Sequence, residues 1–262
     1  TLLLATGRAW THGRFAPAPK DAGPVGPIYR RMSRWSPAFA LISDFAFLTL
    51  GGGLKRREMI SARLGDVLSE LYILSATLKR WENEGRLQED LPLVRFAAQT
   101  AFDKISESLD LVLANLPARW AGWLLRVLTL PKWASRGPSD ALTEECADLI
   151  SERTETRQRL SGALFHGCSG EGIAKLEEAF ELVIDCAPLE KRLREAGLSQ
   201  EQALHEGRIT DVENDSLTAK NAAVRAVVAV DDFAPDELAK LFPGLKATKQ
   251  RKGPKASKET AK

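Results

Sequence analysis

The sequence predicts an all-α fold, an antiparallel helical bundle followed by shorter helices and a disordered basic tail. Apolar residues recur at three- and four-residue steps through residues 54–84 and 91–115. Glycine and proline stand at the short joints between these segments, as they do between neighbouring helices of a bundle. The stretch Val227–Val230 has strand-like residue types but no second strand to pair with, so a helix is favoured there as well.

The first residues predict helices separated by a loop. Thr1–His12 fits the end of a helix, and the proline- and glycine-rich stretch Phe15–Pro27 predicts a loop. Pro27 can occupy the first turn of a helix that runs to Trp35. Ser36-Pro37 is a second start signal, with serine as N-cap and proline at the first helical position.

The segment Pro37–Leu50 is apolar on almost every face, and Gly51 ends it. It is too short to cross a bilayer, so we expect a buried core helix. Asp44 is the single acid in this segment. A buried carboxylate needs a partner, so we expect Asp44 to pair with an arginine of the next helix rather than to act chemically.

The clearest helices are residues 54–84, which Gly85 stops, and a helix that Asp90-Leu91-Pro92 starts. Their apolar stripes are expected to face the core. The first consists of Ile60, Leu64, Val67, Leu68, Leu71, Leu74 and Leu78, and the second of Val94, Ala98, Ala101, Phe102, Ile105, Leu109, Val112 and Leu113.

After Pro138 the segments become shorter and more charged. Ser199 with Gln202 and Thr210 with Glu213 are capping boxes that predict helices over 200–206 and 211–230. We therefore divide the chain into the end of a preceding region with its loop, a helical bundle with a Trp-rich amphipathic segment, a charged helical subregion and a disordered basic tail. The ranges are 1–27, 28–138, 139–242 and 243–262.

Charge and cysteine usage narrow the function classes. The net charge is +2, but the last twenty residues carry seven cations against the single acid Glu259. That tail has too few apolar residues to fold. A basic tail could contact nucleic acid or anionic lipid, but we favour a solvated terminus and expect no nucleic-acid partner. The widely spaced Cys146, Cys168 and Cys186 form no disulfide framework and favour a reducing compartment such as the cytoplasm. The missing initiator Met indicates a piece of a longer protein.

The sequence holds no complete catalytic or metal-binding set. His12, His166 and His205 are isolated, and no metal-ligand spacing or dinucleotide loop is present. His166 and Cys168 could support a thiol site, but they lack an evident third partner. We therefore assign no catalytic, cofactor-binding or metal-binding residue.

Two segments each leave two interpretations open. In Gly51–Arg57, cations at a helix start could hold a phosphate group, or they could form a solvated basic turn or pair with Glu58. In Leu116–Trp133, Trp120, Trp123, Leu124, Val127 and Leu128 share one helical face with Arg119 and Arg126 beside it. Such a helix suits a membrane surface, or an interface with another domain or subunit.

Several ordered stretches carry a family resemblance that spans most of residues 28–140 and recurs weakly to 233. The chain resembles the C-terminal helical region of bacterial FadE-type long-chain acyl-coenzyme A dehydrogenases. The stretches that carry it are residues 29–40, 48–58, 61–69 with 71–72, 78–81, 90–93, 114–117, 138–140 and 229–233.

The resemblance implies an FAD-containing oxidoreductase of fatty-acid β-oxidation that converts acyl-CoA to trans-2-enoyl-CoA. In that family the catalytic glutamate and most flavin contacts precede this region, so no catalytic residue is carried over and the fragment alone is expected to be inactive. Implied partners are acyl-CoA through the upstream core, electron-transfer flavoprotein and further copies of the chain. Peripheral contact with the inner membrane through residues 116–133 stays open. The alternative is a non-enzymatic helical scaffold or protein-interaction module.

Overall fold

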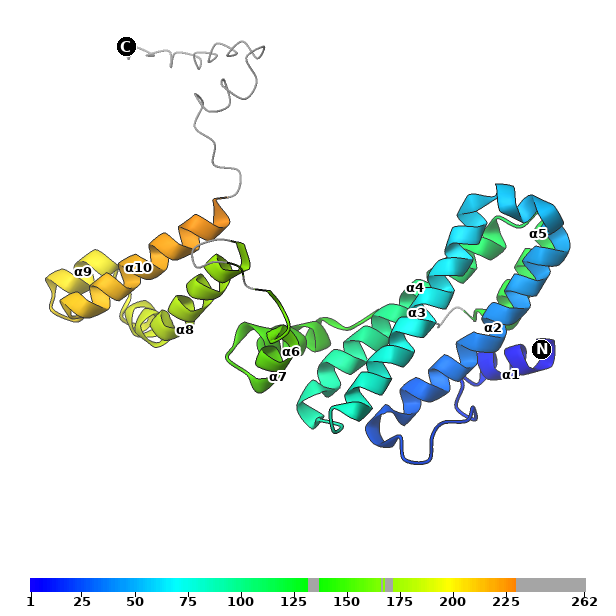
Figure 1. Cartoon of the computed structure of the whole chain (residues 1–262), viewed down its shortest axis with the longest axis horizontal. Helices are drawn as coiled ribbons and strands as arrows, with labels where there is room; N and C mark the ends of the chain where they lie inside the picture. The colour runs from blue at the N-terminus through cyan, green and yellow to red at the C-terminus, as the bar shows by residue number, and fades with distance from the viewer. Residues whose placement is uncertain (132–136, 166, 168–171, 230–262) are drawn as a thin grey trace, which may run out of the picture. The chain divides into compact units, whose positions relative to one another are not determined.

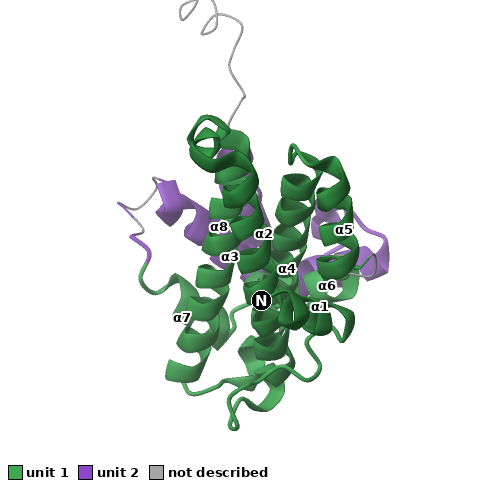
Figure 2. Cartoon of the chain, turned by 90° about the vertical axis from the view of Figure 1, so that its right-hand side faces the viewer, with its two compact units in different colours: residues 1–163 green, residues 164–262 purple. Residues whose placement is uncertain are grey.

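The computed structural model describes residues 1–131, 137–165, 167 and 172–229. Within these ranges every regular element is a helix, which confirms the predicted all-α class (Figure 1). The chain divides into two compact units, Thr1–Ala163 and Leu164–Lys262 (Figure 2). The predicted disordered tail, Trp133 and the pair His166 and Cys168 lie outside the described residues.

Unit 1 is a bundle built on three long helices. In the centre α3 and α4 pack against each other, and α2 packs on both (Figure 1). The shorter α5 packs on α4, and α1 packs on α2 and α5. Its elements are α1 (Leu2–Trp10), η1 (Gly23–Val25), α2 (Gly26–Leu50), η2 (Gly51–Arg56), α3 (Glu58–Asn83), η3 (Gln88–Asp90), α4 (Leu91–Ala114), α5 (Arg119–Thr129), α6 (Asp140–Ser151) and α7 (Glu155–Ser161).

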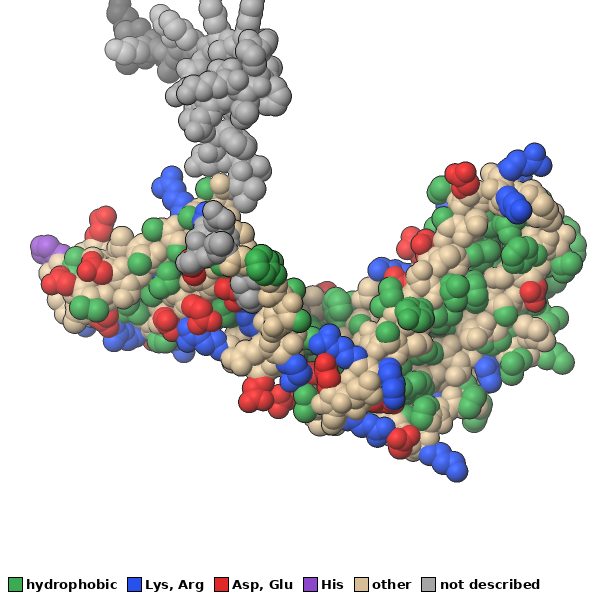
Figure 3. Space-filling model, viewed as in Figure 1, with side chains coloured by type: hydrophobic (Ala, Val, Ile, Leu, Met, Phe, Trp, Pro, Cys, Tyr) green, Lys and Arg blue, Asp and Glu red, His purple; other side chains and the backbone are tan. Residues whose placement is uncertain are grey.

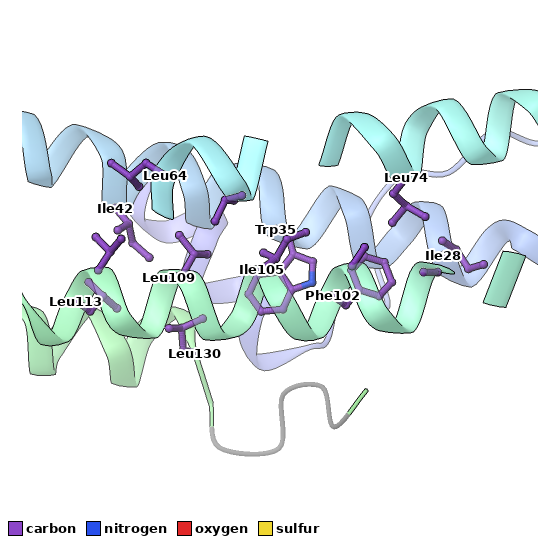
Figure 4. Packing of buried hydrophobic residues seen from close by; sticks show 14 of the residues in the cluster. Ile28, Trp35, Ile42, Leu64, Leu74, Phe102, Ile105, Leu109, Leu113 and Leu130 are labelled. Carbon is purple, nitrogen blue, oxygen red and sulfur yellow. The ribbon is translucent and has the colours of Figure 1, made fainter. Parts of the chain in front are cut away.

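The core of unit 1 lies where the apolar stripes of α2, α3 and α4 meet. Trp35 and Ile42 of α2 lie against Ile105 and Leu109 of α4 (Figure 4). Every residue of the stripe predicted for α4 is buried, which confirms it. The stripe predicted for α3 is confirmed at Ile60, Leu64, Val67, Leu74 and Leu78. It is wrong at Leu68, which is 58% exposed, because the seam against α4 is narrower than the apolar stripe.

Pro37 does not start a helix, contrary to the prediction. It lies inside α2, which runs unbroken from Gly26 to Leu50. A proline within a helix has no N–H for the carbonyl four residues earlier, here that of Ser33. The Arg8 Nη1 atom donates to the Ser33 carbonyl oxygen at 2.8 Å, so α1 supplies the hydrogen bond that Pro37 cannot make.

Asp44 is exposed, so the expected buried ion pair is wrong, and no ion pair of Asp44 occurs within the described residues.

Because α2 is longer than predicted, its length no longer argues against a membrane span. The stretch Gly23–Arg56 is long and apolar enough to cross a membrane by composition. The expected buried core helix is only partly right: Trp35, Ile42 and Ala46 are fully buried in the bundle, whereas Phe47 and Leu48 on another side of α2 are exposed.

Unit 2 is smaller and contains α8 (Gly172–Ala196), α9 (Gln200–His205) and α10 (Asp211–Val228). Its α8 and α10 pack together around a small core of Cys186, Leu189, Ala203, Ile209 and Leu217. Both predicted capping boxes are present, at the start of α9 and of α10. The α10 helix ends at Val228, and residue 230 lies outside the described residues.

Candidate docking face and basic hollow

The most exposed aromatic residues of α5 lie on one side of that helix. Trp120 is 73% exposed and Trp123 is 67% exposed, with Leu124 and Val127 also exposed beside them. Leu128 of the same predicted face is half-buried. We call Trp120, Trp123, Leu124 and Val127 the docking face. An exposed apolar cluster of this kind marks a surface that meets lipid or another protein.

The opposite side of α5 fixes the docking face to the bundle. Ala121, Gly122 and Leu125 are buried, and α5 packs on both α4 and α1. A methyl group on Gly122 would lie 2.4 Å from the Leu113 carbonyl oxygen, so only glycine permits this approach. Arg126 pairs with Asp110 of α4 at 2.5 Å, which leaves Arg119 as the cation of α5 without an ion pair in the described residues. The helix is therefore anchored with its tryptophans outward.

The apolar surface continues onto α1, which packs against α5. Leu3 is 89% exposed, and Leu2 and Leu4 are about half exposed. Hydrophobic side chains gather over α1 and α5 along one side of unit 1, and Lys and Arg side chains gather near the turn between α2 and α3 (Figure 3). The contribution of α1 could not be inferred from spacing, because α1 lies far from α5 in the sequence.

The basic turn predicted at residues 51–57 borders a hollow of about 500 Å³. Gly51 adopts φ +49° and ends α2, and the six residues 51–56 form η2 rather than the start of α3. Arg57 is the N-cap of α3. We call this space the basic hollow; its lining residues are Arg56, Arg57, Glu58, Met59, Ile60, Arg63 and Asn115. The predicted ion pair with Glu58 does not occur within the described residues.

Asp90 is the buried acid of unit 1, and its surroundings are structural. The Arg159 Nη2 atom lies 2.5 Å from its carboxylate, and the Thr156 hydroxyl donates to the same oxygen at 2.8 Å. Both partners belong to α7, whereas Asp90 lies at the start of α4. The network ties α7 to the bundle and satisfies the carboxylate, so it does not resemble a poised catalytic acid.

A second buried polar group is Arg34, which is 1% exposed and whose guanidinium lies over the Trp35 ring at 4.2 Å. Burial, followed by the nearby charge of Arg31, lowers the pKa of Arg34 to about 10. Burial also lowers the pKa of His12, with smaller contributions from Arg34 and Arg31. Both effects disfavour the charged form of His12, which lies in the turn after α1.

The remaining candidates that the structure describes show no reactive arrangement. Cys146 and Cys186 are free and buried, and burial raises the pKa of both thiols, so both are poor nucleophiles. No cluster of three or more His, Cys, Asp or Glu side chains that could hold a metal occurs within the described ranges.

The chain was compared with known protein families and structures. Residues 2–233 match the family model for the C-terminal domain of bacterial-type acyl-CoA dehydrogenase. The chain belongs to this family. No solved structure matches the chain. The family assignment confirms the resemblance found in the sequence, and the match extends beyond residues 28–140 to cover α1 and all three helices of unit 2. This acyl-CoA dehydrogenase C-terminal domain is thus part of an oxidoreductase.

Proposed function

We propose that this C-terminal domain serves an FAD-dependent acyl-CoA dehydrogenase of fatty-acid β-oxidation, which oxidises acyl-CoA to trans-2-enoyl-CoA. The family match over residues 2–233 carries the proposal. By the family resemblance, the catalytic glutamate and most flavin contacts would lie upstream of Thr1. Electrons would leave through electron-transfer flavoprotein, and the enzyme would act as a homo-oligomer in the cytoplasm.

The test compares the full-length enzyme with residues 1–262 alone. We expect the purified full-length enzyme to retain FAD, whose absorbance bleaches when a long-chain acyl-CoA is added. We expect residues 1–262 alone to retain no flavin and to oxidise no acyl-CoA. Stoichiometric flavin on residues 1–262 would contradict this division of labour. A full-length protein without flavin or enoyl-CoA product would favour a non-enzymatic scaffold instead.

For the domain itself we propose peripheral docking on an anionic lipid surface through α5, with the inner membrane as the cellular site. Trp120 and Trp123 present their rings to solvent, as an interfacial helix requires. Arg119 stands next to Trp120 in the sequence and adds a cation beside the rings. Each cation close to an anionic surface contributes about 1 kcal/mol, which salt screens. Long-chain acyl groups are poorly soluble, so an enzyme acting on them would gain from a position at lipid.

Vesicle co-sedimentation of the full-length enzyme tests the docking. We expect binding to anionic vesicles that weakens but persists at high salt, with a blue shift of tryptophan fluorescence. The Trp120→Ala/Trp123→Ala variant should lose the salt-resistant part, because ring burial supplies it. Tyr72→Ala is the matched control, since Tyr72 is an equally exposed aromatic residue (75%) on α3. Equal pelleting of all three proteins at every salt concentration would assign the docking face to another domain or subunit.

A further inference from the structure

The basic hollow is lined by three arginines and a single acid, Glu58. Arg56, Arg57 and Arg63 form no ion pair within 4.0 Å in the described part of the chain. Some other cations of unit 1 do have a carboxylate partner, as in Arg80–Glu84 at 2.8 Å and Lys104–Glu70 at 3.0 Å. Three like charges around one space repel each other, so an anion placed between them would remove that repulsion.

The floor of the hollow is held by the fold. Ile60 is 3% exposed and belongs to the core of unit 1. The Arg57 carbonyl oxygen accepts hydrogen bonds from the N–H groups of Ile60 and Ser61, which fixes the first turn of α3. On the other side, the Asn115 side-chain amide donates to the Leu111 carbonyl oxygen at 2.7 Å. Two walls that are distant in sequence, the start of α3 and the end of α4, are therefore rigidly placed.

The charge of the lining selects the kind of anion. Three guanidinium groups and the Glu58 carboxylate leave an excess of positive charge that a phosphate monoester, with about −1.5 to −2 at neutral pH, would neutralise. A phosphodiester carries less charge, and a carboxylate offers fewer acceptor oxygens. Guanidinium groups bind phosphate oxygens in a bidentate manner, which a lysine cannot do.

We infer that the basic hollow binds a phosphate monoester. The ligand identity rests on the proposed function: coenzyme A carries such a group on its ribose, so the hollow would hold the nucleotide end of an acyl-CoA. Under the proposed function, the flavin and the catalytic glutamate would come from the upstream region and not from this hollow. Its role would be capture of the substrate by its charged end.

Calorimetric titration of residues 1–262 at low ionic strength tests the inference. The ligands are coenzyme A, dephospho-coenzyme A without the ribose phosphate, and inorganic phosphate. We expect coenzyme A to bind at least about tenfold more tightly than dephospho-coenzyme A, a difference of roughly 1.4 kcal/mol. Arg56→Gln/Arg63→Gln should abolish that preference. Lys55→Gln/Arg95→Gln, which removes two exposed cations outside the lining, should keep it.

The possible outcomes distinguish a failure of the proposed phosphate site from a failure of the proposed enzymatic function. Equal affinity for coenzyme A and dephospho-coenzyme A would overturn the inference, as would an equal loss in both double variants. Weak binding of inorganic phosphate that Arg56→Gln/Arg63→Gln removes, with no preference for coenzyme A, would refute the coenzyme and leave a free phosphate as the source. Failure of the full-length enzyme to oxidise acyl-CoA would refute the proposed function without changing these titrations. Circular dichroism of each variant verifies that the helices are retained.

Discussion

The two units use different interactions to hold helices together. In unit 1, long aliphatic and aromatic side chains from α2, α3 and α4 form one continuous core. In unit 2, the buried set includes a cysteine and an alanine, and much of the order comes from polar contacts. Lys220 pairs with Glu190 at 2.5 Å, Arg192 pairs with Glu213 at 2.6 Å, and Ser199 and Thr210 cap α9 and α10.

This difference indicates which of the two units can hold a binding surface in a fixed position. A large apolar core supports the rigid display of α5 and of the basic hollow, since both attach to α4. Unit 2 has less apolar surface to bury, so its stability depends more on caps and ion pairs, which contribute less each. We therefore place binding surfaces on unit 1 and expect unit 2 to open more readily.

The strongest test of this comparison is a charge in the core of unit 1. Leu64→Asp should unfold unit 1, because Leu64 is 8% exposed and an unpaired buried carboxylate costs several kcal/mol, a large share of a domain's stability. Leu68→Asp is the control one turn further along α3, where the side chain is 58% exposed. Thermal unfolding by circular dichroism measures both. A midpoint equal to wild type in Leu64→Asp would show that this face is not the core.

Helix periodicity accounts for most of what the sequence could predict. The stripes of α3 and α4 follow from local spacing, as do the caps of α9 and α10, because both depend on residues three or four apart. Leu68 was misplaced because spacing gives the width of a stripe but not how much of it a neighbour covers.

Long-range contacts explain the other errors. Pro37 was taken as a helix start because nothing near it shows that Arg8 satisfies the Ser33 carbonyl group. Asn115 joins Arg56 and Arg63 in the hollow only because the end of α4 meets the start of α3. The exposed tryptophans of α5 could be predicted as one face, whereas the choice of which face packs on α4 depended on Gly122.

In unit 2 the substitution that corresponds to Leu64→Asp in unit 1 is Leu217→Ala. Leu217 is 2% exposed on α10, and its truncation leaves a cavity that costs about 2–5 kcal/mol. With so small a core, we expect α8 and α10 to lose amide-exchange protection while α3 and α4 keep theirs. Val212→Ala on the same helix, where the side chain is 74% exposed, should change little. Uniform loss of protection across both units would contradict their separate stabilities.

A smaller loss of folding stability is expected from a substitution at the contact between α5 and α4. Gly122→Ala would place a methyl group against the Leu113 carbonyl oxygen, and the resulting shift should cost about 1–3 kcal/mol. Gly65→Ala on α3 is the control, because nothing lies within 4 Å of its added methyl group. That variant should gain stability through its higher helix propensity. Chemical denaturation measures both, and equal gains would mean that α5 does not approach α4 closely.

The smallest expected effect is a pH dependence confined to the start of α10. Hydrogen bonding from the Thr210 backbone and then from Arg192 lowers the pKa of Glu213 below its usual value. A depressed carboxyl pKa stabilises the folded state fully above the unfolded-state pKa, which is about 4.3 for glutamate. That stability is lost as the pH falls through the folded-state pKa. We expect the first turn of α10 to fray upon acidification, with faster amide exchange at Asn214 and Asp215 than at Leu74 of unit 1.

The control for this prediction is Glu213→Gln, which keeps the reciprocal hydrogen bonds of the capping box but cannot titrate. Its exchange rates, corrected for intrinsic chemistry, should therefore lack the acid-dependent rise. An acid-dependent rise of the same size in Glu213→Gln would show that the effect does not come from Glu213. Because Glu213 is only half-buried and lies in unit 2, the change should stay local and leave the thermal midpoint of unit 1 unaltered.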